Sequence, residues 1–131
     1  MKTQRLHIRE ADGQEVKDIC GFAIDLINPE FAGSKKISLA TIFVDPHKSS
    51  KPHCHEVTEE IYYFIRGHGK VIVEDQAFNV GPGSAVYIPL RKLHQVINTS
   101  STRLKFISAD APPFDPKDIF YRKLRRIVKT K

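Results

Sequence analysis

The sequence predicts an all-β protein, a barrel or sandwich of short strands. Its 7 glycines and 8 prolines recur at short intervals. The segments between them are short and rich in β-branched and aromatic side chains, which is typical of such folds and not of helical ones. We expect strands over residues 20–27, 37–44, 60–65, 70–73, 84–88, 94–98 and 104–109, with weaker strands near 6–8 and 77–80.

The length and the charge distribution indicate one domain followed by a short basic tail. A chain of 131 residues fits a single hydrophobic core. The formal charge is +6, but residues 122–131 contain six Lys or Arg and no acid, so residues 1–121 carry 15 basic and 15 acidic side chains. We therefore expect a domain over residues 1–121 and a basic tail over 122–131. Because the excess charge is confined to the tail, nucleic-acid binding is the less favoured interpretation.

Three further features bear on the environment and the path of the chain. No apolar run approaches the length of a membrane span, and the polar start of the chain lacks the pattern of a secretory signal, so we expect no membrane association and a cytoplasmic location. In that compartment Cys20 and Cys54 are expected to be free thiols. Prolines at positions 112, 113 and 116 lack ladder donors, so residues 111–116 are expected to cross the outside of the barrel.

The run PHCHEVTEEIYYFIRG suggests a metal site. His53 and His55 lie two residues apart, so on a strand they share a face about 6.6 Å apart while Cys54 points away. Glu60 opens the next strand, on the face of Tyr62, and His94 opens another strand far along the chain. Three imidazoles and one carboxylate suit a divalent transition metal and disfavour Ca²⁺ or Mg²⁺, which prefer oxygen ligands.

The spacing of these residues resembles the two motifs of the cupin superfamily. The first motif, usually written G-x5-H-x-H-x(3,4)-E-x6-G, is matched by His53, His55, Glu60 and Gly67. The second, G-x5-P-x-G-x2-H-x3-N, is matched by four further residues: Gly83, Pro89, His94 and Asn98. The resemblance covers residues 37–109. It implies a double-stranded β-helix, or jelly-roll barrel, with short N-terminal strands added.

The resemblance also implies the ligands: His53, His55, Glu60 and His94, holding one divalent ion of Mn, Fe, Ni, Cu, Co or Zn. Glu59 competes with Glu60, because the motif tolerates three intervening residues, but counting back from Gly67 selects Glu60. The sequence departs from the motifs at two glycine positions. These are occupied by His47 and Arg91, which we treat as candidate residues for contacting the substrate.

Three functions remain open. Four protein ligands on a six-coordinate ion leave two adjacent positions, which favours a dioxygenase-like oxidoreductase acting on a small chelating enol or diol. A cavity lined by Tyr62, Phe64 and Val96 would suit such a substrate, with Tyr62 as a candidate catalytic residue beside His47 and Arg91. A sugar or sugar-phosphate isomerase or epimerase is the alternative. It would use His47 or Tyr87 as a base and would hold a phosphate through the cations Arg66, Arg91 or Lys92.

The third possibility is a metal-holding or ligand-binding module without turnover. The opposite face of the strand that carries Glu60 would present Ile61, Tyr63 and Ile65. These side chains are too apolar to face water, so either the N-terminal strands or a second subunit should cover them. Many small cupins form dimers, so the resemblance to this family implies that a second subunit covers these side chains and that the protein is a homodimer.

Overall fold

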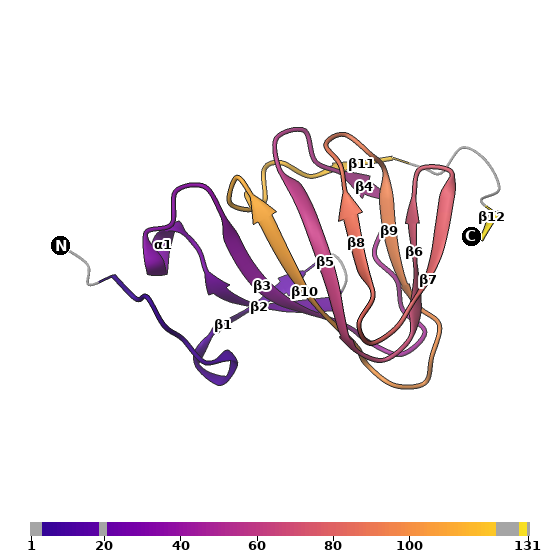
Figure 1. Ribbon diagram of the computed structural model, residues 1–131, viewed down its shortest axis with the longest axis horizontal. Helices are drawn as coiled ribbons and strands as arrows, with labels where there is room; N and C mark the ends of the chain where they lie inside the picture. The colour runs from indigo at the N-terminus through magenta and orange to yellow at the C-terminus, as the bar shows by residue number, and fades with distance from the viewer. Residues whose placement is uncertain (1–3, 19–20, 123–128, 131) are drawn as a thin grey trace.

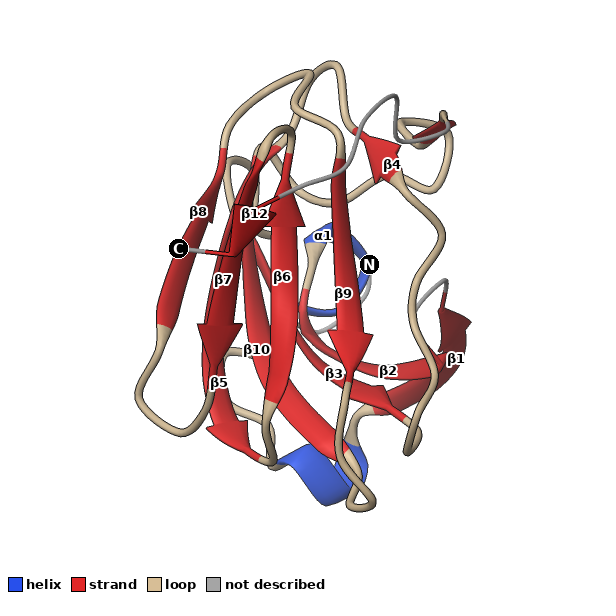
Figure 2. Cartoon of the chain, turned by 90° about the vertical axis from the view of Figure 1, so that its right-hand side faces the viewer, coloured by secondary structure: helices blue, strands red, loops and turns tan. Residues whose placement is uncertain are grey.

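The computed structural model describes residues 4–18, 21–122 and 129–130, and their strands form two antiparallel-rich sheets that face each other (Figures 1 and 2). The first sheet runs in the order β1 (Gln14–Asp18), β2 (Gly21–Ile27), β3 (Ser38–Val44), β10 (Leu104–Ala111), β5 (Glu59–Arg66), β8 (Ala85–Ile88). The second runs β11 (Phe120–Tyr121), β4 (His53–Cys54), β9 (His94–Asn98), β6 (Gly69–Val73), β7 (Gln76–Val80), β12 (Lys129–Thr130). The predicted all-β class is confirmed.

The core lies between the two sheets. Side chains alternate between buried and exposed along most of β5, so that Glu60, Tyr62 and Phe64 face inward. Phe64 and Phe106 pack with ring centroids 4.8 Å apart. They belong to one buried apolar cluster that also includes Val71 and Val96 of the second sheet. This packing holds both sheets at a fixed separation below the candidate site.

The main strands match the predicted segments within two residues at each described end. Residue 20, where the first predicted strand begins, lies outside the described residues. The predicted strand near residues 6–8 is wrong: Leu6 is 77% exposed and the segment is irregular. It is held instead along the short helix α1 (Pro29–Ala32), where the backbone N–H of Arg5 donates to the carbonyl of Phe31 at 2.9 Å.

A strap, which we define as residues 112–119, follows β10 and covers one mouth of the barrel. Pro112, Phe114 and Pro116 are exposed, in keeping with the predicted course of residues 111–116 across the outside, and Phe114, Pro116 and Ile119 also line the cavity. Proline cannot extend the sheet, yet its ring can still pack against apolar side chains, so the strap serves as a wall. Of the basic tail, residues 123–128 and 131 lie outside the described residues. Lys129 and Thr130 pair in parallel with β7.

The helices in the described parts of the chain are a single turn of 3-10 helix (Glu10–Asp12) and α1. Both are far too short to cross a membrane, and no helix of these parts qualifies as a membrane span.

Candidate metal centre

Three histidines from two distant segments of the chain meet between the two sheets. His53 lies on β4, His55 follows directly, and His94 begins β9. His53 and His94 are paired residues of neighbouring antiparallel strands, which is why side chains 41 positions apart lie with ring centroids 4.1 Å from each other. One ligand atom from each of the three lies within 4.8 Å of the other two. All three residues are buried.

The other nitrogen of each imidazole is held by a backbone carbonyl. His53 Nδ1 lies 2.7 Å from the carbonyl oxygen of Lys51, and His94 Nδ1 lies 3.0 Å from that of Lys92. His55 Nδ1 lies 2.6 Å from the carbonyl oxygen of Asp118. A carbonyl oxygen can only accept a hydrogen bond, so Nδ1 must be the donor. In the neutral form of each ring the proton is therefore on Nδ1, and Nε2 has a free lone pair. This is the tautomer that a metal ligand requires.

Glu60 adds a carboxylate to this group from the opposite sheet. Its Oε1 lies 2.9 Å from His55 Nε2 and 3.4 Å from His94 Nε2. Glu60 is buried, whereas Glu59 is exposed and accepts a hydrogen bond from the Tyr87 hydroxyl at 2.8 Å. The alternation of β5 therefore turns Glu60, and not Glu59, toward the histidines.

A hydrogen-bond network orients the Glu60 carboxylate. The Tyr62 hydroxyl donates to Oε1 at 3.2 Å, and the Ser108 hydroxyl lies 3.1 Å from Oε2. Ser108 Oγ also lies 3.0 Å from Oδ1 of Asp110, two residues further along β10. The buried Asp110 thus places a second carboxylate close to Glu60. One serine hydroxyl has a single proton, so it donates to only one of these two acceptors at a time.

The protonation of the cluster follows from burial and pairing. Burial, together with the neighbouring His94, lowers the pKa of His53 to about 3. Burial also opposes a charge on His55, but the hydrogen bond with Glu60 outweighs it and raises the pKa of His55. Burial opposes a charge on Glu60 too, yet its interactions with the imidazoles of His55 and His94 hold its pKa well below the usual range. Without a cation, these opposite shifts favour a buried His55–Glu60 ion pair over the neutral pair.

The donor set fits a divalent transition metal. His94 Nε2 is fully buried, and its 3.4 Å contact with Glu60 Oε1 does not have the geometry of a hydrogen bond. This is a costly state for a polar atom unless a ligand occupies the position. Three imidazole nitrogens with fixed tautomers and one oriented carboxylate suit ions from Mn²⁺ to Zn²⁺. Cys54 does not join the group: it is buried, unpaired and on the alternate face of β4.

Asp118 of the strap fixes the loop between two of these residues. Its carboxylate accepts hydrogen bonds from three consecutive backbone N–H groups, those of Glu56 at 2.8 Å, Val57 at 3.1 Å and Thr58 at 3.0 Å. Its own carbonyl holds His55. Charge-assisted bonds to backbone amides are among the strong ones. A single residue of the strap therefore sets both the loop 56–58 and the ring orientation of His55.

An open cavity of about 480 Å³ adjoins the cluster. His53, His55, Glu60 and Tyr62 line one end, and the wall is largely apolar. Tyr62 lines the cavity as predicted, but Phe64 and Val96 do not: both are fully buried in the core beneath it. The space instead extends sideways under β2 and β3, because the first sheet has two more strands, β1 and β2, on this side.

The other residues considered from the sequence lie elsewhere. His47 and Arg91 are exposed loop residues with positive φ of 60° and 63°, and neither lines the cavity. The backbone N–H of Arg91 donates to the carbonyl of His55 at 2.7 Å, so Arg91 contributes through its backbone. Arg66 and Lys92 are likewise exposed and outside the lining.

Sequence reasoning missed three polar residues around the site. Ser108 and Asp110 continue the inward face of Leu104 and Phe106, so polar side chains on an otherwise apolar face were a usable signal. Asp118 gave no such signal, because a contact between residues 118 and 55 depends on the path of the strap.

Comparisons with known proteins agree with this architecture. The family model described as "Cupin domain" matches residues 40–110. The uncharacterized protein MJ1618 of Methanocaldococcus jannaschii is 31% identical over 94 residues, which cover 72% of this chain and 75% of that protein. The polyketide cyclase RemF from Streptomyces resistomycificus superposes with a TM-score of 0.76 at 21% identity, over 92% of this chain and 87% of that one. A predicted oxalate decarboxylase from Thermotoga maritima gives 0.71 at 21% identity, over 82% and 99%.

The chain belongs to the cupin family. The family model covers more than half of the 131 residues, and the strands around the site adopt the cupin barrel of the two solved structures. The predicted superfamily and fold are confirmed.

Proposed function

We propose that this protein is a metal-dependent cupin enzyme, a dioxygenase-like oxidoreductase that acts on a small chelating enol or diol. The observation that supports it most directly is the convergence of three buried imidazoles, each with Nδ1 bonded to a carbonyl, on one side of an open cavity. In this proposal His53, His55, Glu60 and His94 are the ligands. Few described side chains compete for these lone pairs, since only Glu60 approaches them.

A bound divalent ion would supply Lewis acidity and, for a redox-active metal, electron exchange with dioxygen. The protein residues position the carboxylate and the substrate and can transfer protons. Tyr62 holds the Glu60 carboxylate in place and lines the cavity where a substrate ring would lie. Ser108 and Asp110 offer positions beside the centre from which a proton can be accepted or donated. A dioxygenase inserts both atoms of O₂ into the product, so this chemistry needs no external reductant.

The sugar-phosphate alternative has weaker support. Binding a phosphate ester requires cations in the cavity. The three cations considered for that role, Arg66, Arg91 and Lys92, are exposed and do not line it. Among the described residues, the exposed Lys17 is the one Lys or Arg of the lining. This favours a substrate without a phosphate.

The test is metal analysis followed by oxygen consumption. Protein from metal-defined growth is analysed for its metal, then loaded with Fe²⁺, Mn²⁺, Ni²⁺ or Cu²⁺ and mixed with catechols and β-diketones in an oxygen electrode. We expect one metal per chain and stoichiometric O₂ uptake with at least one substrate. Zinc alone without O₂ uptake would favour the isomerase, and retained metal without any turnover would favour a binding module.

We also propose a homodimer formed through the outer face of β5. Ile61, Tyr63 and Ile65 remain exposed there, and Tyr87 of the neighbouring β8 extends the same apolar surface. The N-terminal strands lie at the other side of the first sheet, beside β3, so they do not cover it. Light scattering on the wild type should give about twice 14.9 kDa, and an Ile61→Lys variant should give the monomer mass. A monomeric wild type would contradict this proposal.

A further inference from the structure

The inner face of the first sheet is hollow on the side of β2 and β3. Paired residues of neighbouring strands share a face, so a row of pairs shows how the side chains change in size across the sheet. In one row they shrink from β5 through β10 to β3, as Tyr62, Ser108 and Ala40. In the next row they shrink from β10 through β3 to β2, as Phe106, Ile42 and Ala23. The small side chains on β2 and β3 therefore leave open the space that aromatic rings fill on β5 and β10.

The strap covers this side of the cavity. We define the hollow as the part of the cavity lined by Ala23, Ala40, Ile42, Phe114 and Ile119. Among the described residues, the second sheet contributes only His53 to the lining, so the strap forms the opposite wall. The backbone N–H of Phe114 donates to Ser38 Oγ at 2.9 Å, which ties the strap to the start of β3. The Phe114 ring lies 6.1 Å from that of His55, with the two planes at 83°, so the hollow adjoins the histidines directly.

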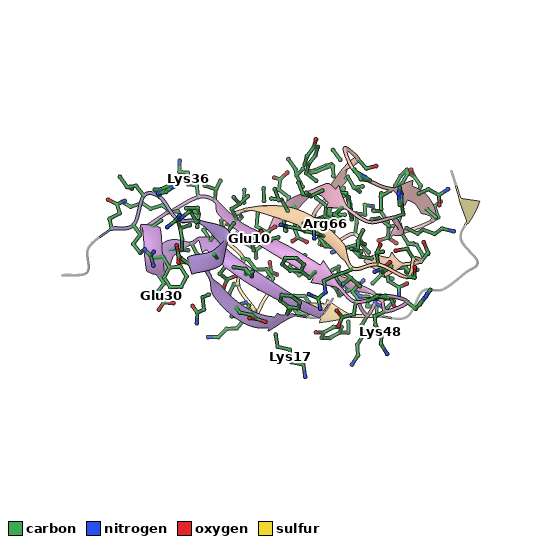
Figure 3. The ribbon with its side chains drawn as sticks, turned by 90° about the horizontal axis from the view of Figure 1, so that it is seen from below. Glu10, Lys17, Glu30, Lys36, Lys48 and Arg66 are labelled. Atoms are coloured by element: carbon green, nitrogen blue, oxygen red, sulfur yellow. The ribbon has the colours of Figure 1, made fainter. Side chains whose placement is uncertain are left out.

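The charged residues of the lining outside the histidine cluster do not call for a charged substrate. Lys17 and Glu30 are exposed, and Figure 3 shows the side chain of Lys17 extending away from the ribbon. Asp25 and Asp110 each interact with other groups of the protein. What the hollow offers to a ligand is therefore mainly apolar surface, and an apolar group gains free energy when it leaves water for such a surface.

The cavity is larger than a single aromatic ring requires. An engineered apolar cavity of about 150 Å³ holds one benzene molecule. The cavity here measures about 480 Å³ and is partly open to solvent. A one-ring diol bound at the histidines would leave the hollow to water, whose contact with the apolar wall is unfavourable. A second ring on the same molecule would displace that water.

We propose that the substrate carries an apolar body of two fused rings, which lies in the hollow against Phe114, and that Ala23 and Ala40 set the upper limit of its size. The diol or enol head of the same molecule lies at the histidines. This inference rests on the proposed function for the position of the head. The position of the body can be tested without a metal, so the two can fail separately.

Two diols with the same head test the selection by size. Catechol has one ring, and naphthalene-2,3-diol has two fused rings. Each is titrated without oxygen into cobalt(II)-loaded protein, where the visible spectrum of the cobalt reports chelation, and each affinity is corrected for the affinity of the diol for free cobalt(II). Because the second ring takes four further carbons out of water, we expect naphthalene-2,3-diol to bind at least about fivefold more tightly than catechol. A smaller ratio would overturn the inference.

Filling the hollow should remove this preference. Ala40→Leu adds three carbons at a half-buried position of the lining, whereas Ala11→Leu makes the same change on the exposed 3-10 helix outside the lining. We expect the ratio of the two affinities to fall to about one in Ala40→Leu and to keep its wild-type value in Ala11→Leu. Both affinities are measured on the same protein sample, so a loss of metal or of folded protein cancels in the ratio.

A second variant tests the wall without filling the space. Phe114 is exposed on the strap, so Phe114→Ala should leave the barrel folded while it removes part of the apolar wall. We expect the ratio to fall at least about twofold in this variant. An unchanged ratio in Phe114→Ala or in folded Ala40→Leu would contradict the position of the body.

A metal-free experiment separates this inference from the proposed function. The neutral compounds 2-naphthol and phenol lack the diol, so they probe the hollow alone. We expect 2-naphthol, at a concentration at which phenol has no effect, to raise the unfolding temperature of the metal-free wild type but not that of Ala40→Leu. If neither diol alters the cobalt spectrum while 2-naphthol stabilises the wild type in this way, the proposed function fails and the hollow stands. If both diols chelate but 2-naphthol stabilises no more than phenol does, the inference is overturned and the proposed function stands.

Discussion

The three histidines of the candidate site are oriented in two different ways. His53 and His94 bond to the carbonyl two residues before them, at Lys51 and Lys92. His55 bonds to Asp118, 63 residues away along the chain. The first arrangement is built into the local strand geometry, while the second exists only when the strap lies across the barrel. The site therefore has two locally oriented histidines and one whose orientation depends on tertiary structure.

The largest expected effect comes from removing a locally oriented ligand. His53→Ala and His94→Ala should each abolish stoichiometric metal, because a site that loses one of three imidazoles loses most of its affinity. Plasma mass spectrometry on protein dialysed after loading measures the metal content. His7→Ala, at an exposed position outside the cluster, serves as the control. A variant that keeps full metal and a folded circular-dichroism spectrum would remove that histidine from the ligand set.

Replacing the carboxylate should weaken the centre without destroying it. Glu60→Gln keeps the shape and one oxygen but loses the charge, so we expect the metal affinity to fall about 10- to 100-fold. Competition with a chelator measures the affinity. Glu59→Gln is the matched control, because Glu59 is exposed and bonded to Tyr87. If Glu59→Gln lowered the affinity instead, the carboxylate assignment would be wrong.

The dependence of His55 on the strap can be tested at Asp118. Asp118→Asn replaces one acceptor oxygen by an amide donor that opposes the backbone N–H groups of residues 56–58. We expect a loss of about 1–3 kcal/mol in the free energy of unfolding and about a tenfold loss of metal affinity.

Asp115→Asn makes the same charge change at an exposed position of the strap. The affinity of that variant should not change. A merely structural role for Asp118 would lower stability and leave the affinity of the folded protein intact, so chelator competition well below the unfolding temperature distinguishes the two roles.

The smallest effect concerns pH. Because the pKa of His55 is raised, its ring is protonated below that pKa and an incoming ion must displace the proton. Metal affinity should stay constant at higher pH and fall by up to about tenfold per unit once the pH drops below the pKa of His55. His53, with a pKa of about 3, remains neutral throughout and adds no dependence near neutrality. Affinity that rises as the pH falls would contradict this assignment.

The parts of the protein that were predictable are those with local rules. Alternation along β5 indicated that Glu60 and Tyr62 share a face, and the spacing of His53, His55 and His94 indicated a common site. The irregular segment around Leu6 and the contact of the strap with the cavity were not predictable in the same way. Both depend on which surface the segment meets after the sheets have formed, and no periodicity records that.

The sequence by itself determined the class of fold, the barrel family and the residues that could bind a metal, because strand alternation and motif spacing act within a few neighbouring residues. Only the tertiary structure decided that Asp118 orients His55 and that Asp25 faces the same cavity as the histidines. It also decided that Arg91 turns away from that cavity. These contacts join residues many positions apart, so they follow from the order of strands in the sheets and from the path of the strap.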